Sequence, residues 1–312
     1  MRTLGSSAAQ LFRSPLAFHH SQLGKRQLSS GALDSTEHNE HEARSMLAQY
    51  KGGCVRLHTD KHTGIATLTV ENERSRNAFT GSMMLELCEH VRALSDWQDG
   101  RVVCVRGAQR QFCAGGDLAF MRAIMNAHDG ARMSAFMQDA LMRLHRLPMI
   151  VVAQVLGHAL GGGAELAAAC DLVLMESAAR IGFVQVTLGV STGWGGAWHL
   201  RRRVARATAL QLLATGVVLT AEHAKRAGVA DEILDSERAM HDHCRNIAAA
   251  APNAAAARVP KQLMLNCDAT QRSSGEMLQR ERHLFTTLWG SDGHHRQFNA
   301  VMQRLKKRSA ND

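Results

Sequence analysis

The sequence predicts an α/β protein built in layers, and three observations carry this prediction. Two short alternating segments, 55–59 and 64–70, flank a polar turn and predict a β-hairpin. Apolar residues at helical spacing and then a short buried strand follow the hairpin. Further along, a continuous apolar strand is followed by a helix and by another strand, which is typical of a sheet covered on both faces.

The first part of the chain contains the hairpin, two helices and one strand. Apolar residues recur at helical spacing over 83–94, so a helix is expected there. Residues 101–105 are apolar enough to form a short buried strand. A second helix is expected at about 132–146, because Pro148 cannot continue a helix.

The second part begins with the apolar strand at 149–155, which leads into a run of glycines. A helix is expected through 164–170, and residues 171–175 return as a strand. From about residue 220 onward the chain is expected to be mostly helical. No sequence repeat of fixed period is present, which argues against a solenoid of identical units.

The composition is that of a soluble globular protein. Of the 312 residues, 45% are hydrophobic and 21% are charged, so general disorder is excluded. Only 4 residues are proline, which excludes collagen-like and proline-rich chains. No stretch reaches the roughly 18 consecutive apolar residues that cross a bilayer, so a membrane-spanning protein is not expected.

The net charge is uneven along the chain. Lys and Arg exceed Asp and Glu by 37 − 28 = 9, a balance that suits anionic partners. Residues 1–33 contain basic residues and no acid, and are rich in Ser, which predicts a mitochondrial presequence and a location in the matrix. A disordered basic tail and a cytosolic protein are the alternatives. Residues 34–52 are expected to be a polar linker.

Cysteine and histidine give no sign of a metal site. The 7 cysteines contain no CxxC pair and their odd number cannot all pair within the chain, so reduced thiols are expected. The cluster of His38, Glu40, His41 and Glu42 lies in the polar stretch and lacks the HExxH pattern. A solvated linker is therefore favoured there over a metal site.

Three adjacent glycines, Gly161 to Gly163, stand where a strand passes into a helix. The first amides of a helix have no intrahelical partner and face outward with the positive end of its dipole, which favours an oxyanion. Glycine also lets a substrate approach the backbone without meeting a Cβ atom. Glu165 follows in the first turn and is a candidate acid or base. The alternative is a packing turn in which Glu165 only complements the dipole.

A second glycine turn, at 112–118, also follows a strand and precedes a helix. Two such turns can supply two converging amides. Two donors aimed at one thioester oxygen stabilise an enolate or a tetrahedral anion, which is usually the largest catalytic contribution in such sites.

Together these motifs resemble the crotonase (enoyl-CoA hydratase/isomerase) superfamily, and the resemblance covers about residues 53–305. The residues that carry it are Phe112-Cys113-Ala114-Gly115-Gly116-Asp117-Leu118, Ala159-Leu160-Gly161-Gly162-Gly163-Ala164-Glu165-Leu166, Cys170-Asp171 and Asn77-Ala78. The resemblance implies the α/β crotonase fold, a superhelix of stacked β-β-α turns with a C-terminal helical region that forms a homotrimer or hexamer. It implies a core at 53–235 and a C-terminal helical region at 236–305. The basic run 306–308 predicts a basic tail at 306–312.

The resemblance also implies an acyl-CoA substrate and assigns site residues. The amides of Gly116 and Gly162 are expected to form an oxyanion hole, and Glu165 matches one of the two glutamates of the hydratases. The substrate and CoA site is expected to include Arg74, Arg76, Asn77, Ala114, Gly116, Asp117, Leu118, Ala119, Gly161, Gly162 and Trp194. From the residues alone, Arg74 and Arg76 are equally consistent with solvated loop charges, and Trp194 with a packed core aromatic.

Gln185 matches the second hydratase glutamate, and this departure decides the expected chemistry. An amide does not ionise at neutral pH, so the pair of carboxylates that orients and deprotonates water is incomplete. Loss of CO2 from a malonyl-type thioester needs only an enolate held by two amides. Trp194-Gly195-Gly196 and Leu288-Trp289-Gly290 add a likeness to the decarboxylases of the family. We therefore expect a carboxy-lyase that uses no metal or organic cofactor, since CoA is part of the substrate.

Other readings remain. A single-carboxylate enoyl-CoA isomerase or weak hydratase is the alternative within the same functional class, and a non-catalytic or nucleic-acid-binding member of the family is the alternative from a different class. The basic runs 201–203 and 306–308 favour nucleic acid only weakly, because aromatic residues make up 4% of the chain and no binding motif is recognised. Residues 189–193 spell GxSxG, but no fixed Asp and His partners follow, so a serine hydrolase is not favoured.

Overall fold

The computed structural model describes residues 40–268, 274–289, 291–296, 299 and 303. The presequence predicted for 1–33 and the basic tail predicted for 306–312 lie outside these residues. Within the described part of the chain, no helix has the length and apolar character needed to cross a membrane.

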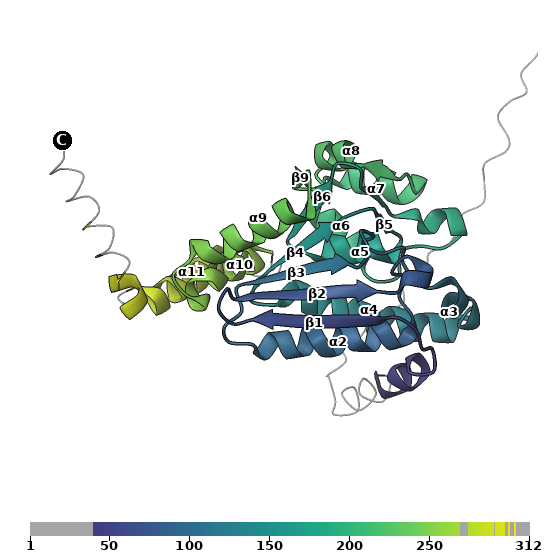
Figure 1. Cartoon of the computed structure of the whole chain (residues 1–312), viewed down its shortest axis with the longest axis horizontal. Helices are drawn as coiled ribbons and strands as arrows, with labels where there is room; N and C mark the ends of the chain where they lie inside the picture. The colour runs from purple at the N-terminus through teal and green to yellow at the C-terminus, as the bar shows by residue number, and fades with distance from the viewer. Residues whose placement is uncertain (1–39, 269–273, 290, 297–298, 300–302, 304–312) are drawn as a thin grey trace, which may run out of the picture. The chain divides into compact units, whose positions relative to one another are not determined.

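Six strands form the main sheet, in the order β1-β2-β3-β4-β6-β9 (Figure 1). The predicted hairpin is confirmed, because β1 and β2 pair antiparallel, whereas all the other neighbours in this sheet pair parallel. The strands are β1 (Cys54–Asp60), β2 (Ile65–Glu71), β3 (Val102–Gly107), β4 (Ile150–Val155), β6 (Leu172–Glu176) and β9 (Glu232–Leu234).

Both faces of the sheet are buried at its central strands β3, β4 and β6, as the continuous apolar strands predict, whereas the edge strand β1 has exposed residues. Alternate residues of β3 serve the two faces. Val103 and Val105 join the larger core with α2 (Gly81–Asp96), which lies below the strands in Figure 1, and with α4 (Ala127–Arg146). Val102 and Cys104 join a smaller core with α9 (Glu237–Ala250) on the opposite face. The predicted helices at 83–94 and 132–146 are therefore present and each extends beyond its predicted limits.

A second, smaller layer explains how the turns stack. After β4 and β6 the chain continues directly into the short strands β5 (His158–Leu160) and β7 (Arg180–Gly182), which pair parallel, and β8 (Leu219–Thr220) completes this sheet. Isolated bridges extend the same layer, joining Phe79 to Gly116 and Cys113 to Ala159. Each bridge joins two successive turns, so the predicted stack of β-β-α turns is confirmed.

The remaining elements are shorter helices around these layers and a helical C-terminal part. They are η1 (Glu73–Ser75), α3 (Leu118–Ala123), α5 (Gly162–Ala169), η2 (Val184–Leu188), α6 (Gly196–Arg203), α7 (Arg206–Thr215), α8 (Ala221–Ala227), α10 (Ala254–Cys267) and α11 (Ser274–Leu288).

The prediction of a polar linker at 34–52 is wrong for residues 40–47, which the structure describes as a helix. Residues 40–47 are helical, and Ala43, Met46 and Leu47 are buried in the larger core. Their spacing of three and four places them on one helical face. Polar residues surround them in the sequence, which hid this short apolar stripe.

Candidate active site

The two glycine turns lie against each other. Cys113 donates its amide to the His158 carbonyl at 2.9 Å, and its own carbonyl accepts from Leu160 at 3.0 Å. A Cβ atom on Gly163 would lie 2.2 Å from the Cys113 carbonyl oxygen. One on Gly115 would lie 3.2 Å from the Gly162 nitrogen. Backbone therefore packs on backbone here, which requires glycine at these positions.

The amides of Gly116 and Gly162 have no acceptor among the described residues, and the same is true of the Gly163 and Ala164 amides in the first turn of α5. The amide that follows Gly116 and the one that precedes Gly162 are used, because Asp117 donates to the Phe79 carbonyl at 2.8 Å and Gly161 donates to the Gly182 carbonyl at 2.9 Å. Gly162 is the first residue of α5, so its amide also carries the positive end of that helix dipole. The structure thus brings the two predicted oxyanion donors to adjoining turns.

Glu165 lies in the first turn of α5 and is 2% exposed. Its Oε1 accepts hydrogen bonds from the amides of Trp194 and Gly196, each at 2.8 Å. Its Oε2 accepts one from Gln185 Nε2 at 2.8 Å. Burial raises the pKa of Glu165, although the amides and the Gln185 hydrogen bond oppose the shift by stabilising the carboxylate. The site therefore holds one carboxyl group that is protonated more readily than a free glutamate.

Gln185 belongs to η2 and lies at the position predicted to oppose Glu165. Its Nε2 is used by Glu165, but its Oε1 is buried and has no hydrogen-bond partner in the described structure. A buried acceptor without a donor is unusual and costs free energy, about 1–3 kcal/mol. The pair therefore contains one carboxyl group and one amide with an unused oxygen.

Trp194 connects the carboxylate to the oxyanion turn. Its amide holds Glu165, and a Cβ atom on Gly162 would lie 2.5 Å from its ring. The ring also makes an edge-to-face contact with Phe79, with centroids 5.6 Å apart, and its Nε1 donates to the Met133 sulfur at 3.2 Å. Trp194 is 4% exposed, and its ring forms an apolar wall beside Gly162.

Sequence reasoning missed the amides of Trp194 and Gly196 as the holders of Glu165. A signal for them exists in Trp194-Gly195-Gly196, because Gly195 has a φ of 91° and a Cβ on Gly196 would lie 2.4 Å from Glu165 Cγ. Both glycines are therefore required for the loop to wrap around the carboxylate.

Several predicted substrate residues have structural duties. Asn77 accepts from the Asn72 amide at 2.9 Å and donates to the carbonyls of Ala108 and Gln111, so its side-chain amide is fully used. Asp117 caps α3 by accepting from the amides of Ala119 and Phe120, and it also accepts from Ser75 Oγ. Both side chains therefore hold the backbone around the Gly116 turn.

The other predicted residues lie around the same turns. Arg74 and Arg76 are exposed in and after η1, and the Arg76 carbonyl accepts from the Ala114 amide at 3.1 Å. Leu118 and Ala119 are exposed at the start of α3, one and two residues after Asp117. These exposed side chains adjoin the Gly116 turn. Among the described residues, none of them forms a hydrogen bond with Glu165 or Gln185.

Other candidate chemistries find little support. Burial raises the pKa of the Cys113 thiol to about 12, so it is not a thiolate nucleophile. In the GxSxG segment, the Ser191 hydroxyl donates only to the Thr192 carbonyl, at 3.4 Å, within the described chain. No group of three or more His, Cys, Asp or Glu side chains among the described residues could hold a metal ion.

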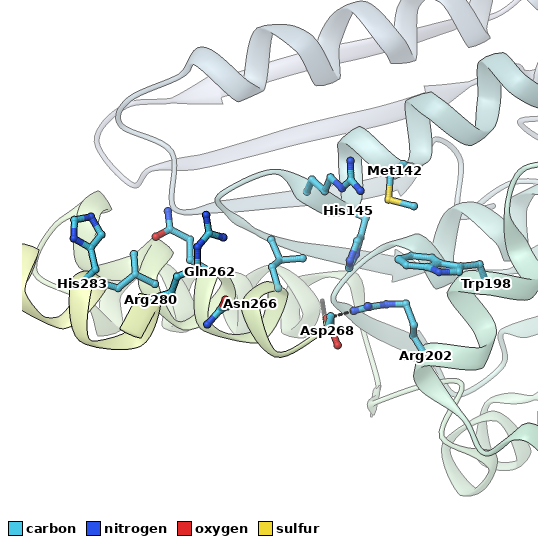
Figure 2. Close-up of a pocket in the computed structure, with 12 residues that line it drawn as sticks. Met142, His145, Trp198, Arg202, Gln262, Asn266, Asp268, Arg280 and His283 are labelled. Carbon is cyan, nitrogen blue, oxygen red and sulfur yellow. Dashed lines mark hydrogen bonds and ion pairs between the residues drawn. The ribbon is translucent and has the colours of Figure 1, made fainter. Parts of the chain in front are cut away.

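A cavity of about 570 Å³ lies elsewhere, between α4 and α6 on one side and α10 and α11 on the other (Figure 2). It is lined by His145, Trp198 and Arg202, among others, and Arg202 pairs with Asp268 across it. Gly116, Gly162, Glu165 and Gln185 do not line this cavity. The candidate active site is therefore separate from it.

Comparison with known proteins agrees with this geometry. The family model described as enoyl-CoA hydratase/isomerase matches residues 60–311. Ethylmalonyl-CoA decarboxylase of Danio rerio is 42% identical over 251 residues, covering 79% of this chain and 83% of that protein. The protein of the same name from Rattus norvegicus is 37% identical over 263 residues, covering 83% and 88%.

Solved structures of the same fold include two enoyl-CoA hydratases. The one from Bacillus anthracis superposes with a TM-score of 0.72 at 25% identity, covering 81% of this chain and 97% of that one. The one from Polaromonas sp. JS666 gives a TM-score of 0.72 at 25% identity, covering 81% and 98%.

Proposed function

Because this chain belongs to the enoyl-CoA hydratase/isomerase family, we propose that it is a carboxy-lyase that decarboxylates ethylmalonyl-CoA, with methylmalonyl-CoA as a second substrate. The observation that carries the proposal is the pair formed by Glu165 and Gln185. Relatives that carry the name ethylmalonyl-CoA decarboxylase support the choice of substrate.

The amides of Gly116 and Gly162 bind the thioester oxygen in this mechanism. When the C–C bond to the carboxylate breaks, its electron pair moves onto the thioester, which becomes an enolate, and CO2 leaves. The two donors are already oriented, and they stabilise the negative charge that develops on the oxygen. No activated water is needed, so a site with one carboxyl group is sufficient.

Glu165 is the proposed proton donor to the α-carbon of the enolate. It follows Gly162 by less than one helical turn, and burial raises its pKa, which favours the protonated form. Gln185 is neutral and therefore does not repel the substrate carboxylate, whereas a second glutamate would. The residues of this site need no metal or organic cofactor for the reaction.

An enoyl-CoA isomerase is the second candidate, favoured by the presence of a single carboxyl group at the site. Such an enzyme would use Glu165 to remove a proton from one carbon and return it to another. The two functions share the oxyanion hole and differ in whether carbon dioxide is released.

A panel of malonyl-, methylmalonyl-, ethylmalonyl- and crotonyl-CoA separates these functions. Purified protein is expected to convert ethylmalonyl-CoA to butyryl-CoA with release of CO2, measured by product mass. Efficient hydration of crotonyl-CoA without release of CO2 from ethylmalonyl-CoA contradicts the proposal.

Assembly and compartment are further parts of the proposal. A homotrimer or hexamer is supported by the family resemblance and by exposed apolar side chains on α11. The matrix is supported by the acid-free basic composition of residues 1–33, with the cytosol as the alternative. Imaging a fluorescent reporter that carries residues 1–40 tests the compartment, and a diffuse cytosolic signal contradicts it.

A further inference from the structure

The unused oxygen of Gln185 is the feature that the proposed mechanism leaves unexplained. Gln185 Nε2 donates to Glu165 Oε2 at 2.8 Å, while Gln185 Oε1 is buried without a partner. A side-chain amide has a donor end and an acceptor end, and only the donor end suits an ionised carboxylate. The observed orientation is therefore the one that fits ionised Glu165.

Protonation of Glu165 reverses this preference. A carboxyl group with a proton on Oε2 donates a hydrogen bond instead of accepting one. The Gln185 amide then fits better when it is turned over, with Oε1 accepting from Glu165. Its two N–H donors now occupy the place where Oε1 was unpartnered, and they need an acceptor.

The substrate carboxylate is an acceptor of the right charge, and the loop of Gln185 is fastened beside the oxyanion turn. Gly161 donates to the Gly182 carbonyl at 2.9 Å, and a Cβ on Gly161 would lie 3.8 Å from Val184 Cγ2. A malonyl-type substrate carries its carboxylate one carbon from the thioester carbonyl. A thioester held at Gly162 thus presents its carboxylate within the same small site.

Resting on the proposed function, we infer that Gln185 recognises the carboxylate that the substrate loses, by turning its side-chain amide over as Glu165 takes up a proton. Binding of the carboxylate and protonation of Glu165 then favour each other. The overall reaction consumes one proton, because a carboxylate leaves as neutral CO2 and a C–H bond forms. The proton taken up by Glu165 on binding is the one transferred to the α-carbon. When CO2 leaves, the amide loses its acceptor and returns to its first orientation.

The histidines on the described elements that pack against α5 do not explain this proton. The elements packed on α5 contribute His145 from α4, His158 from β5 and His199 from α6. Burial lowers the pKa of His145 to about 4 and that of His199 to about 3, so both are neutral, and His158 contacts Gln111 at 3.3 Å. Two arginines of α6 are paired with aspartates, in the pairs Arg202–Asp268 and Arg203–Asp231.

The test compares two CoA thioethers that lack the carbonyl needed for decarboxylation. S-(2-carboxybutyl)-CoA keeps the carboxylate, and S-butyl-CoA is the same molecule without it. In Gln185→Met the affinity for the first ligand is expected to fall about 10- to 100-fold relative to the second, the effect of losing a hydrogen bond to a charged group. Gln211→Met changes an exposed glutamine on α7 and is expected to keep the wild-type ratio.

Calorimetry in two buffers of different ionisation enthalpy measures how many protons the protein takes up when each ligand binds. Wild-type protein is expected to take up about one proton with the carboxylate ligand and none with S-butyl-CoA, and Glu165→Gln none with either. An affinity ratio in folded Gln185→Met within threefold of wild type, or no proton uptake by wild type, overturns the inference. These measurements involve no turnover, so they test the inference separately from the proposed function. If ethylmalonyl-CoA releases CO2 but the affinity ratio of the two thioethers is unchanged in Gln185→Met, the role of Gln185 is refuted and the decarboxylase function stands.

Discussion

At the scale of single residues, Glu165 decides how the proton is delivered. Glu165→Gln keeps an acceptor for the amides of Trp194 and Gly196 but removes the proton donor. We expect turnover of ethylmalonyl-CoA to fall by about 10²–10⁴-fold, the usual contribution of a general acid, with thioester binding retained. Butyryl-CoA formation and the Kd of S-butyl-CoA measure the two effects.

The pH dependence of turnover follows from the same residue. The donor must be protonated, so turnover falls as pH rises through the pKa of Glu165, and burial places that fall at higher pH than for a free glutamate. The residual activity of Glu165→Gln should lack this step. A pH profile with an identical step in both proteins would show that another group donates.

Gln185→Glu tests why an amide stands opposite Glu165. The variant supplies the second carboxylate, which should raise crotonyl-CoA hydration from near zero because two carboxylates orient and deprotonate water. The same change should impair decarboxylation, since a second negative charge repels the substrate carboxylate in a desolvated site. Both activities are assayed by product mass, with folding checked by circular dichroism. Unchanged decarboxylation would show that this position does not meet the substrate carboxylate.

Sequence reasoning placed the glycine turns, Glu165 and Gln185 together because these residues lie within recognisable motifs. It could not assign the side chains of Asn77 and Asp117, because each also has a partner that is distant in the chain, Gln111 for Asn77 and Ser75 for Asp117. A polar residue near a motif has the same appearance in sequence whether it binds a ligand or satisfies the backbone. Only the folded contacts separate these two uses.

At the scale of elements, the close approach of the two turns is fixed by Gly163. A Cβ there would lie 2.2 Å from the Cys113 carbonyl oxygen, so Gly163→Ala must push two backbones apart although alanine favours helices. We expect the free energy of unfolding to fall by about 2 kcal/mol or more, a cost typical of overpacking. Urea unfolding measures it.

Gly130 in α4 provides the matched control, because a Cβ there meets nothing within 4 Å. Gly130→Ala is expected to increase stability by about 1 kcal/mol through helix propensity alone. Equal effects of the two substitutions would mean that the two turns are not in backbone contact.

The attachment of α10 depends on an ion pair between buried Lys261 and partly buried Asp171. Lys261 Nζ lies 2.7 Å from Asp171 Oδ2 and donates to the Met149 carbonyl at 2.9 Å, which joins α10 to the ends of β4 and β6. Burial lowers the pKa of Lys261 and raises that of Asp171, and their mutual attraction opposes both shifts. Lys261→Met removes the cation beside Asp171, a partly buried carboxylate that still accepts from the Val151 amide at 2.7 Å, and is expected to cost about 2–3 kcal/mol in urea unfolding.

Two further variants complete this test. Lys261→Met with Asp171→Leu should recover part of the loss, because no buried charge then remains. Lys225→Met, an exposed lysine on α8, should change little. A loss for Lys261→Met no greater than that for Lys225→Met would contradict a structural role for the pair.

Most elements were predictable because their apolar periodicity is long and clear, as in α2 and α4. Residues 40–47 were missed, since three apolar residues among polar ones give a weak signal and their burial depends on the core that they meet. The short strands β5 and β7 were also missed, because three residues are too few to show a hydrophobic period. They are defined by pairing with each other, which is a tertiary property.

At the scale of the whole molecule, α11 presents an apolar stripe to solvent. Leu278 and Phe285 on α11 and Trp289, the residue after its last turn, are 60%, 53% and 63% exposed, and their spacing of seven and four places them on one side. The rings of Phe285 and Trp289 stack with centroids 5.0 Å apart. Large aromatic residues that remain exposed together are typical of an interaction surface.

This stripe, together with the family resemblance, predicts assembly through α11. Sedimentation velocity at micromolar concentration is expected to give a trimer or a hexamer for the wild type, because burial of these side chains against further copies removes apolar area from water. Phe285→Ser with Trp289→Ser should shift the protein toward monomers. Leu210→Ser, which changes an exposed leucine on α7, should leave the assembly intact and so control for the loss of an apolar side chain elsewhere. A monomeric wild type would mean that α11 has another partner, and an unchanged assembly in the double variant would place the interface on a different surface.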